Sequence, residues 1–168
     1  MLKQLFYRGP SFTTLYTEYA LKGKIDEKAA IKASGEIHIN ASVDKVWNVL
    51  VNLSSWPHFD PNFSDVKLES TVSVGAKASF KIKGFPIQGT FAVVRPNQEL
   101  TWVGMSLWTK AIDRHVVQAI SKETTRLYLE ESLSGVFVPL MFTSTRLLHQ
   151  HQGWLNAIKT YVEAAQQI

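Results

Sequence analysis

Hydrophobic and polar residues alternate along the middle of the chain, between residues 66 and 133. A repeat of two residues is typical of β-strands that bury one face. Turn-forming residues interrupt the alternation at Gly75, at Gly84 and Pro86, at Pro96 and Asn97, and at Lys122 and Glu123. The pattern therefore predicts six strands, at residues 66–69, 76–82, 87–94, 100–105, 112–120 and 125–133. Because the links are short, we expect an antiparallel meander rather than βαβ units.

One more strand and two short helices are predicted before this meander. Residues 30–39 alternate as a strand does. Residues 43–50 follow a serine that is a favourable N-cap, and they place apolar side chains on one face, as a helix does. A second helical segment, residues 53–56, is expected to end at Pro57, and residues 58–63 are expected to form a constrained loop.

Both ends of the chain carry the spacing of helices. Near the C-terminus, residues advance in steps of three and four along one face, at Leu140, Ser144, Leu148, His151, Leu155, Ile158, Val162 and Ala165. A helix over residues 142–167 would be about 39 Å long, enough to lie across a whole sheet. Near the N-terminus, a shorter helical face is expected to end at Gly23, with apolar residues at Phe12, Leu15, Tyr16 and Tyr19.

The composition indicates one folded domain without a nucleic-acid-binding surface. The chain has 168 residues, of which 45% are hydrophobic, and roughly 100–200 residues form one domain. The net charge is +4, and Lys and Arg are spread along the sequence instead of clustering, so no nucleic-acid partner is expected. Nine Phe, five Trp and five Tyr are many rings for one core. They are expected to pack around one another or around a ligand.

Missing signals exclude several classes of protein. The sequence has no Cys, which excludes disulfides, Cys-based zinc sites and thiol nucleophiles. It has no Gly-rich phosphate loop, no nucleophile elbow and no pair of His at a recognised ligand spacing, so we expect neither a cofactor nor a metal. We find no leader sequence and no apolar run of about 18 residues. We therefore expect a cytoplasmic protein without a transmembrane segment.

The order of elements and four stretches of sequence resemble the START-like, or SRPBCC, superfamily. The stretches are ASGEIHINASVDKVWNVLVNLSSWPHF, ELTWVG, LYLEESLSG and the closing helix. The polyketide cyclase/dehydrase-type branch is the most similar, and the resemblance covers about residues 24–166. It implies an α+β helix-grip fold, in which a seven-stranded antiparallel sheet curls around a long C-terminal helix and two short helices follow the first strand. We accordingly expect an N-terminal extension, residues 1–23, and a START-like ligand-binding domain, residues 24–168.

The resemblance also implies a function. Members of the superfamily bind lipids, sterols, hormones, polyketides or aromatic compounds in an apolar cavity, and a minority are enzymes. We therefore expect a carrier or sensor of a hydrophobic small molecule, which is aromatic, polyketide or isoprenoid in nature. Two alternatives stay open. One is an aromatase/cyclase-like enzyme acting on a polyketide-type substrate, and the other is a peripheral membrane or protein-interaction module that uses the N-terminal segment.

Glu131 is the first candidate for site chemistry. It shares strand parity with Leu127, Leu129 and Leu133, so on an inward face its carboxylate would lie in apolar surroundings. Burial raises the pKa of a carboxyl group or requires a partner for it, and both properties mark ligand-binding and acid–base residues. A partly solvated strand face or a structural ion pair is the alternative.

Three more polar residues are candidates for the same cavity. His151 lies on the apolar face of the C-terminal helix, either as a structural hydrogen-bonding residue or as a donor or base in the cavity. Arg114 and His115 are neighbours on one strand, so only one of them faces inward. We expect this to be His115, because an unpaired buried Arg is costly, and His115 would pair with Glu131 if their strands are adjacent. An inward Arg114 would instead clamp an anionic ligand. The catalytic candidates are therefore Glu131, His115 and His151.

The remaining candidates are rings, loop residues and helix residues around the expected cavity. In the loop after the second short helix, His58 and Asp60 form the nearest approach to an acid–base pair, with ordinary solvated loop residues as the alternative. We expect Trp47 and Phe91 to pack in the core. The other residues expected to line the cavity are Trp56, Phe59, Trp102, Trp108, Leu148 and Leu155.

Overall fold

A single seven-stranded antiparallel sheet forms the centre of the molecule. The computed structural model describes residues 7–165. The strand order is β1-β7-β6-β5-β4-β3-β2, so the meander runs from β2 to β7 and β1 pairs with β7. The strands are β1 Ile31–Ile39, β2 Phe63–Leu68, β3 Lys77–Ile82, β4 Phe85–Arg95, β5 Glu99–Ser106, β6 Thr109–Ser121 and β7 Thr124–Ser134. The predicted meander is confirmed, except that β2 begins inside the segment expected to be a loop.

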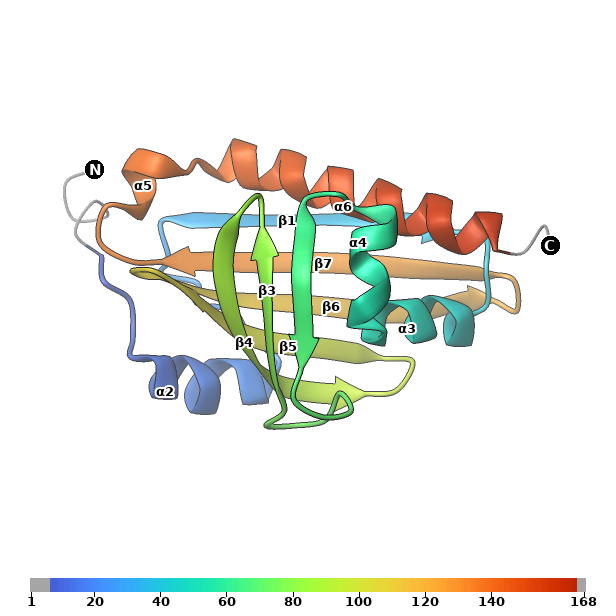
Figure 1. Cartoon of the computed structure of the whole chain (residues 1–168), viewed down its shortest axis with the longest axis horizontal. Helices are drawn as coiled ribbons and strands as arrows, with labels where there is room; N and C mark the ends of the chain where they lie inside the picture. Colours follow the sequence, from blue (N-terminus) through green and yellow to red (C-terminus); the bar gives the residue numbers. More distant parts are fainter. Residues whose placement is uncertain (1–6, 166–168) are drawn as a thin grey trace.

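Helix α6 (Ser144–Ala164) lies along the inner face of this sheet, beside β1 (Figure 1). Thr143 caps its first turn, because the Thr143 hydroxyl accepts a hydrogen bond of 3.1 Å from the Arg146 amide. Its buried side chains are Leu147, His151, Trp154, Leu155, Ile158 and Val162. A curled antiparallel sheet with a long C-terminal helix across it is the helix-grip arrangement that the sequence predicts.

The buried face of α6 differs from the predicted one in its first turns. Leu147 is buried, Leu148 only partly so, and Ser144 is exposed. Leu140 belongs to a separate short helix, α5 (Val138–Met141), and is 68% exposed. A spacing of three and four residues is compatible with two adjacent faces of a helix. The extended backbone at Phe142 separates α5 from α6, and this break determines which of the two faces is buried. The predicted end at residue 167 lies outside the described residues.

Two short helical segments close one end of the space between sheet and helix. Helix α3 (Val43–Val51) buries Val46, Trp47 and Leu50. A 3₁₀ turn, η3 (Leu53–Ser55), leads directly into helix α4 (Trp56–Phe59). The expected stop at Pro57 is wrong, because Pro57 occupies the first turn of α4, where the missing N–H would have no helical partner.

The N-terminal segment packs on the outer face of the sheet, opposite α6 (Figure 1). It consists of α2 (Phe12–Thr14), a π-helical turn η1 (Leu15–Tyr19) and a 3₁₀ turn η2 (Ala20–Lys22). Gly23 follows with φ of 63°, a left-handed conformation that glycine adopts without strain. The buried contacts join Leu15, Ala20 and Ile25 to Ala92, Val103 and Ile112 of the sheet. Leu15 is therefore used for packing and is not available to a membrane or a partner.

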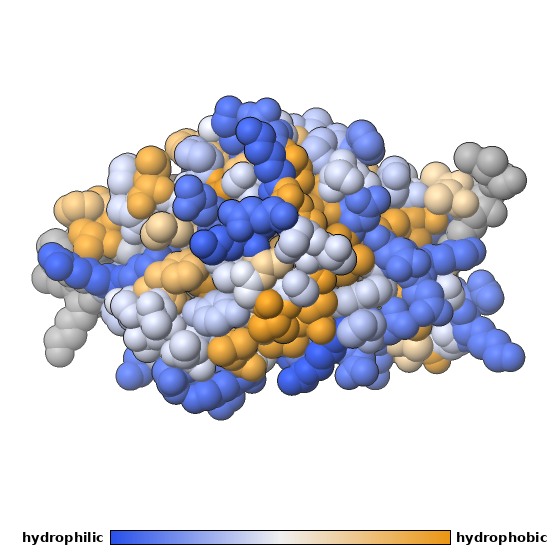
Figure 2. Space-filling view, turned by 60° about the horizontal axis from the view of Figure 1, so that its bottom comes forward, coloured by the Kyte–Doolittle hydropathy of each residue, from blue (hydrophilic) through white to orange (hydrophobic). Residues whose placement is uncertain are grey.

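The face of the molecule that includes the underside of the sheet carries both hydrophobic and hydrophilic residues. Figure 2 shows hydrophobic residues in a band through the middle of this face, between hydrophilic regions. Within residues 7–165, no helix is both long and apolar enough to cross a membrane.

Replacement of Leu15 with Ala tests whether the N-terminal segment is part of the folded unit. Leu15 is 1% exposed, whereas Leu21 in the same segment is 38% exposed. We expect Leu15→Ala to lower the free energy of unfolding by about 2–4 kcal/mol and Leu21→Ala to lower it by less than about 1 kcal/mol. Urea unfolding measures both values. Equal and small losses would contradict the packing of this segment against the sheet.

Candidate functional site

A cavity of about 490 Å³ lies between the inner face of the sheet and α6. Its walls come from α4 and the start of β2 on one side, from β5, β6 and β7 below, and from α6 above. A second pocket of about 170 Å³ adjoins it, because both are lined by Ile82, Lys83, Trp102, Glu131, Arg146, Leu147 and Gln150. The inner space therefore extends from α4 to the β5–β6 turn.

Aromatic rings form one wall of the larger cavity. The buried Trp56 makes edge-to-face contacts with Phe63 and Trp154, at centroid distances of 5.1 and 6.0 Å. Phe59 contacts Trp154 at 6.3 Å, and Trp154 lies 4.9 Å from the ring of His115. The indole N–H of Trp56 donates to the Leu50 carbonyl at 3.2 Å, which fixes the ring orientation. These contacts hold the wall in one arrangement before any ligand enters.

Two glycines make room for Trp102 on the floor of the cavity. Gly89 and Gly104 are register partners on β4 and β5. A Cβ atom at Gly104 would lie 2.5 Å from the Trp102 ring, and one at Gly89 would lie 3.2 Å from it. The ring therefore lies over a strip of bare backbone, where it borders both pockets.

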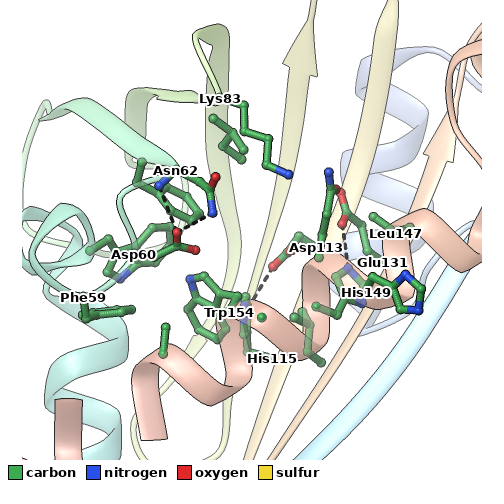
Figure 3. Close-up of a pocket in the computed structure, with 18 of the residues that line it drawn as sticks. Phe59, Asp60, Asn62, Lys83, Asp113, His115, Glu131, Leu147, His149 and Trp154 are labelled. Carbon is green, nitrogen blue, oxygen red and sulfur yellow. Dashed lines mark hydrogen bonds and ion pairs between the residues drawn. The ribbon is translucent and has the colours of Figure 1, made fainter. Parts of the chain in front are cut away.

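Four titratable residues meet in the middle of the cavity. Asp113 on β6 and Glu131 on β7 are direct register partners, so their side chains leave the sheet on the same face. His115 follows two residues after Asp113, and His151 reaches down from α6. Figure 3 shows Asp113, Glu131 and His115 projecting from the strands toward the helix. Each of the four side chains is at most 15% exposed.

Glu131 and His151 are joined by a hydrogen bond of 2.9 Å between Oε2 and Nε2. Burial raises the pKa of Glu131, the hydrogen bond to His151 opposes this increase, and the charge of Asp113 adds to it. Burial alone would lower the pKa of His151, but the hydrogen bond and charge of Glu131, with the charge of Asp113, outweigh it and raise that pKa. The pair therefore retains its proton at a pH at which a free imidazole has lost it.

Several polar atoms around this cluster have no hydrogen-bond partner. His115 Nδ1 lies 2.9 Å from Asp113 Oδ1, but the angles at these two atoms do not fit a hydrogen bond. Neither atom has another hydrogen-bond partner among the described residues. The indole N–H groups of Trp102 and Trp154 and Nδ1 of His151 are also buried without a partner. Because unmet buried polar groups are costly, these atoms lower the stability of the layer around the cluster relative to a fully hydrogen-bonded one.

Two cations stand at the border between the two pockets. Lys83 comes from the β3–β4 turn and extends toward the strands that carry Asp113 and Glu131 (Figure 3). Arg146 comes from the first turn of α6, where its guanidinium lies 5.2 Å from the Phe142 ring. Neither forms an ion pair with any acidic residue in the described part of the chain. The border between the two pockets therefore carries two cations without an acidic partner in residues 7–165.

The prediction for Arg114 as a cavity residue is wrong. Arg114 lies on the outer face of the sheet, where it donates to Glu99 at 2.9 Å and to Glu130 at 2.8 Å. Tyr128 donates to the same Glu130 at 2.9 Å. Because residues alternate along β6, this outward position turns His115 into the cavity. The expected pairing of His115 with Glu131 does not occur, since Asp113 lies opposite Glu131 and His151 binds it.

Three other predicted lining residues also lie away from the cavity. His58 is exposed, and Asp60 accepts hydrogen bonds from the backbone and side-chain nitrogens of Asn62 instead of pairing with a histidine. Leu148 and Leu155 face Gly35 of β1 and are not part of the cavity lining. The structure does place seven predicted residues on the linings, namely Trp56, Phe59, Trp102, His115, Glu131 and His151 on the larger cavity and Trp108 on the smaller pocket.

Asp113, Trp154, Lys83 and Arg146 are lining residues that the sequence patterns did not single out. Asp113 has the same strand parity as His115, so an inward His115 already implies an inward Asp113. Trp154 lies one turn from His151 on α6 and shares its face. Lys83 and Arg146 gave no such signal, because one lies in a turn and the other at a helix start. Among residues 7–165, no three acidic or histidine side chains are arranged to hold a metal ion.

Replacement of Glu131 with Gln tests the origin of the raised His151 pKa. We expect the His151 pKa to fall from above the ordinary value of about 6.5 to below it, because burial then dominates. Titration of the histidine ring signals by NMR measures the change. Glu130→Gln is the matched control, since Glu130 lies on the outer face, and an equal shift in that variant would contradict the assignment.

The same substitution changes how stability depends on pH. In the unmodified chain the folded pKa of His151 is raised, so its contribution to stability is complete below about pH 6.5 and is lost as the pH rises through the folded pKa. In Glu131→Gln we expect the reverse, with stability lost as the pH falls below about 6.5. Urea unfolding at two pH values, one on each side of that value, measures the sign. The same slope in both proteins would contradict it.

Comparisons with known proteins concern the fold. No protein-family model matches the sequence, and no curated protein matches it. A hypothetical protein from Helicobacter pylori is similar in structure, with a TM-score of 0.71 and 19% identity over 81% of this chain and 90% of that chain. A START superfamily protein from Mycobacterium smegmatis has a TM-score of 0.69 and 11% identity over 80% of this chain and 98% of its own.

An enzyme is among the similar structures as well. Norcoclaurine synthase from Thalictrum flavum, in complex with dopamine and hydroxybenzaldehyde, has a TM-score of 0.60 and 16% identity over 78% of this chain and 85% of that chain. Identities this low establish a common architecture and leave the ligand open. With its curled seven-stranded sheet and long C-terminal helix, the chain has the helix-grip fold of the START-like, or SRPBCC, superfamily.

Proposed function

We propose that this protein binds a hydrophobic small molecule with aromatic or polyketide-like character in the cavity between the sheet and α6. The observation that carries the proposal is the cavity of about 490 Å³, which has aromatic walls and a small set of buried polar groups. Ligand pockets of proteins usually have volumes of about 300–1,000 Å³ and combine an apolar lining with a few placed polar groups. The cavity has both properties.

The polar atoms of the lining support a ligand that is not purely hydrocarbon. The carboxylates of Asp113 and Glu131 and the imidazole of His151 line the cavity and can accept or donate hydrogen bonds. A ligand with hydroxyl or carbonyl substituents on an apolar frame would satisfy these groups, while its rings would stack on the surrounding Trp and Phe side chains. A saturated hydrocarbon would displace water from these groups without offering them a hydrogen bond, at a cost in affinity.

Replacement of Gly153 with Trp tests binding in this cavity. Gly153 lies on the cavity side of α6, and a Cβ atom there would meet no atom within 4 Å. The added ring therefore enters open space, and tryptophan is favoured over glycine in a helix interior by about 0.5 kcal/mol. We expect the affinity for an anilinonaphthalene sulfonate dye to fall at least about tenfold, as measured by fluorescence titration.

The matched control places the same ring one position earlier. Gln152 is exposed and does not line the cavity, so Gln152→Trp should bind the dye as the unmodified chain does. Absence of dye binding by the unmodified chain, or equal binding by Gly153→Trp, would count against the proposal.

A second candidate function is acid–base catalysis on a polyketide-type substrate. The observation that favours it is the buried Glu131–His151 pair beside Asp113, because a proton shared within a cavity is available for transfer. The chemistry would be proton abstraction next to a carbonyl, with the cavity shape determining how the chain of the substrate folds. One structural neighbour is itself an enzyme.

A synthetic poly-β-ketone thioester is the probe for this second candidate. Under it we expect Glu131→Gln and His151→Gln each to slow cyclisation by about 100-fold or more, and the pH–rate profile to follow the His151 titration. His58→Gln is the control, because His58 is exposed and away from the cavity. Turnover that survives Glu131→Gln, His151→Ala and His115→Ala alike would remove all three residues from any mechanism.

A further inference from the structure

Large hydrophobic side chains are exposed together at one end of the molecule. The start of β4 contributes Phe85, the β5–β6 turn contributes Leu107 and Trp108, and α5 with its preceding residue contributes Phe137 and Leu140. Their exposed fractions range from 50% to 68%. The three segments adjoin, since Phe85, Trp108 and Met141 line the same small pocket and the Trp108 carbonyl lies 2.6 Å from where a Cβ of Gly135 would be. We call these segments the apolar rim.

Three residues at or beside the apolar rim have a left-handed backbone conformation. Lys83, Leu107 and Phe137 have φ values of 51°, 52° and 67°, in the left-handed region that disfavours bulky residues. Within residues 7–165, the other residues with positive φ are Gly, Asn or Asp. Glycine or asparagine would adopt this conformation at a lower energetic cost at each position. The two-residue turns of the β3–β4 and β5–β6 hairpins require a left-handed residue at positions 83 and 107, but they do not require that residue 107 be leucine.

The stretches of sequence that supply the apolar rim carry positive charges and no acidic residue. The sequence contains no Asp or Glu at residues 70–98, 100–112 or 132–162, which are the stretches that supply the rim. They do contain Lys83, Lys110 and Arg146 at or next to it. Lys110 is partly buried against the Pro10 carbonyl, whereas Lys83 and Arg146 have no acidic partner in the described structure. The rim therefore combines exposed apolar tips with unneutralised positive charge.

We propose that the apolar rim docks on the surface of a lipid bilayer that contains anionic lipids. Leu107, Trp108 and Phe137 would enter the boundary between headgroups and acyl chains, and Lys83 and Arg146 would contact the anionic headgroups. Tryptophan suits this boundary because its ring is apolar while its N–H can remain hydrated. The smaller pocket is lined by the same rim and adjoins the larger cavity, so a docked molecule would open its interior toward the lipid.

The arrangement fits a bilayer better than a second copy of the chain. Two copies joined through this end would bring Lys83 and Arg146 of each copy toward the same positive charges of the other. The tips also belong to three separate segments that project side by side, which suits insertion into a fluid surface. Docking does not depend on the proposed small-molecule function, because the rim residues named for insertion lie outside the larger cavity.

The test uses the full chain and vesicle co-sedimentation. Vesicles of phosphatidylcholine alone are compared with vesicles that also contain phosphatidylserine, at low and high salt. The central variant is Leu107→Asn with Phe137→Asn, because asparagine accepts a positive φ and the fold should be kept or stabilised. The matched control is Ile120→Asn, since Ile120 is 53% exposed at the opposite end of β6. Circular dichroism verifies that every variant is folded.

We expect the unmodified chain and Ile120→Asn to bind the mixed vesicles, with binding weakened by salt. The double Asn variant should bind at least about tenfold more weakly, because two inserted side chains are lost. Lys83→Gln with Arg146→Gln should remove the preference for phosphatidylserine. No vesicle binding by the unmodified chain would overturn the proposal. Equal binding by the double Asn variant, or a loss of self-association in that variant without any vesicle binding, would overturn it as well.

Discussion

The hydrogen bond between Glu131 on β7 and His151 on α6 joins the two layers of the molecule inside its cavity. A carboxylate in this position needs a partner, because burial of an unpaired charge is far more costly than burial of a hydrogen-bonded one. Asp113 lies directly opposite Glu131 and increases this need. The histidine of the helix supplies the partner, and the polar centre of the cavity therefore depends on the position of α6 over the sheet.

The aromatic residues are divided between packing and lining. Trp56 is buried and makes ring contacts to both neighbouring layers, to Phe63 on β2 and Trp154 on α6. Trp102 lies over Gly89 and Gly104 and borders both pockets. Trp108 is half exposed at the other end of the molecule. The high aromatic content thus supports a core, a cavity and an exposed rim at once.

The sequence predicts the sheet and the helices more completely than it predicts the cavity. Alternation along β6 established that Arg114 and His115 face opposite ways, but only a cost argument selected His115, and the ion pairs of Arg114 with Glu99 and Glu130 supply the reason. Helix spacing alone could not distinguish Leu148 from Leu147, because the phase of α6 is set by the break before it. Lys83 and Arg146 reach the cavity only through the folding of the chain, and no local pattern marks them.

The central claim is that the space between sheet and helix holds an apolar ligand with polar substituents. Mass spectrometry of the purified protein under native conditions, followed by organic extraction, tests it most directly. The account predicts a bound small molecule with a ring or carbonyl-rich frame, which is retained by Gln152→Trp and lost from Gly153→Trp. A protein that carries no extractable molecule and takes up neither an apolar dye nor a polyketide would contradict it.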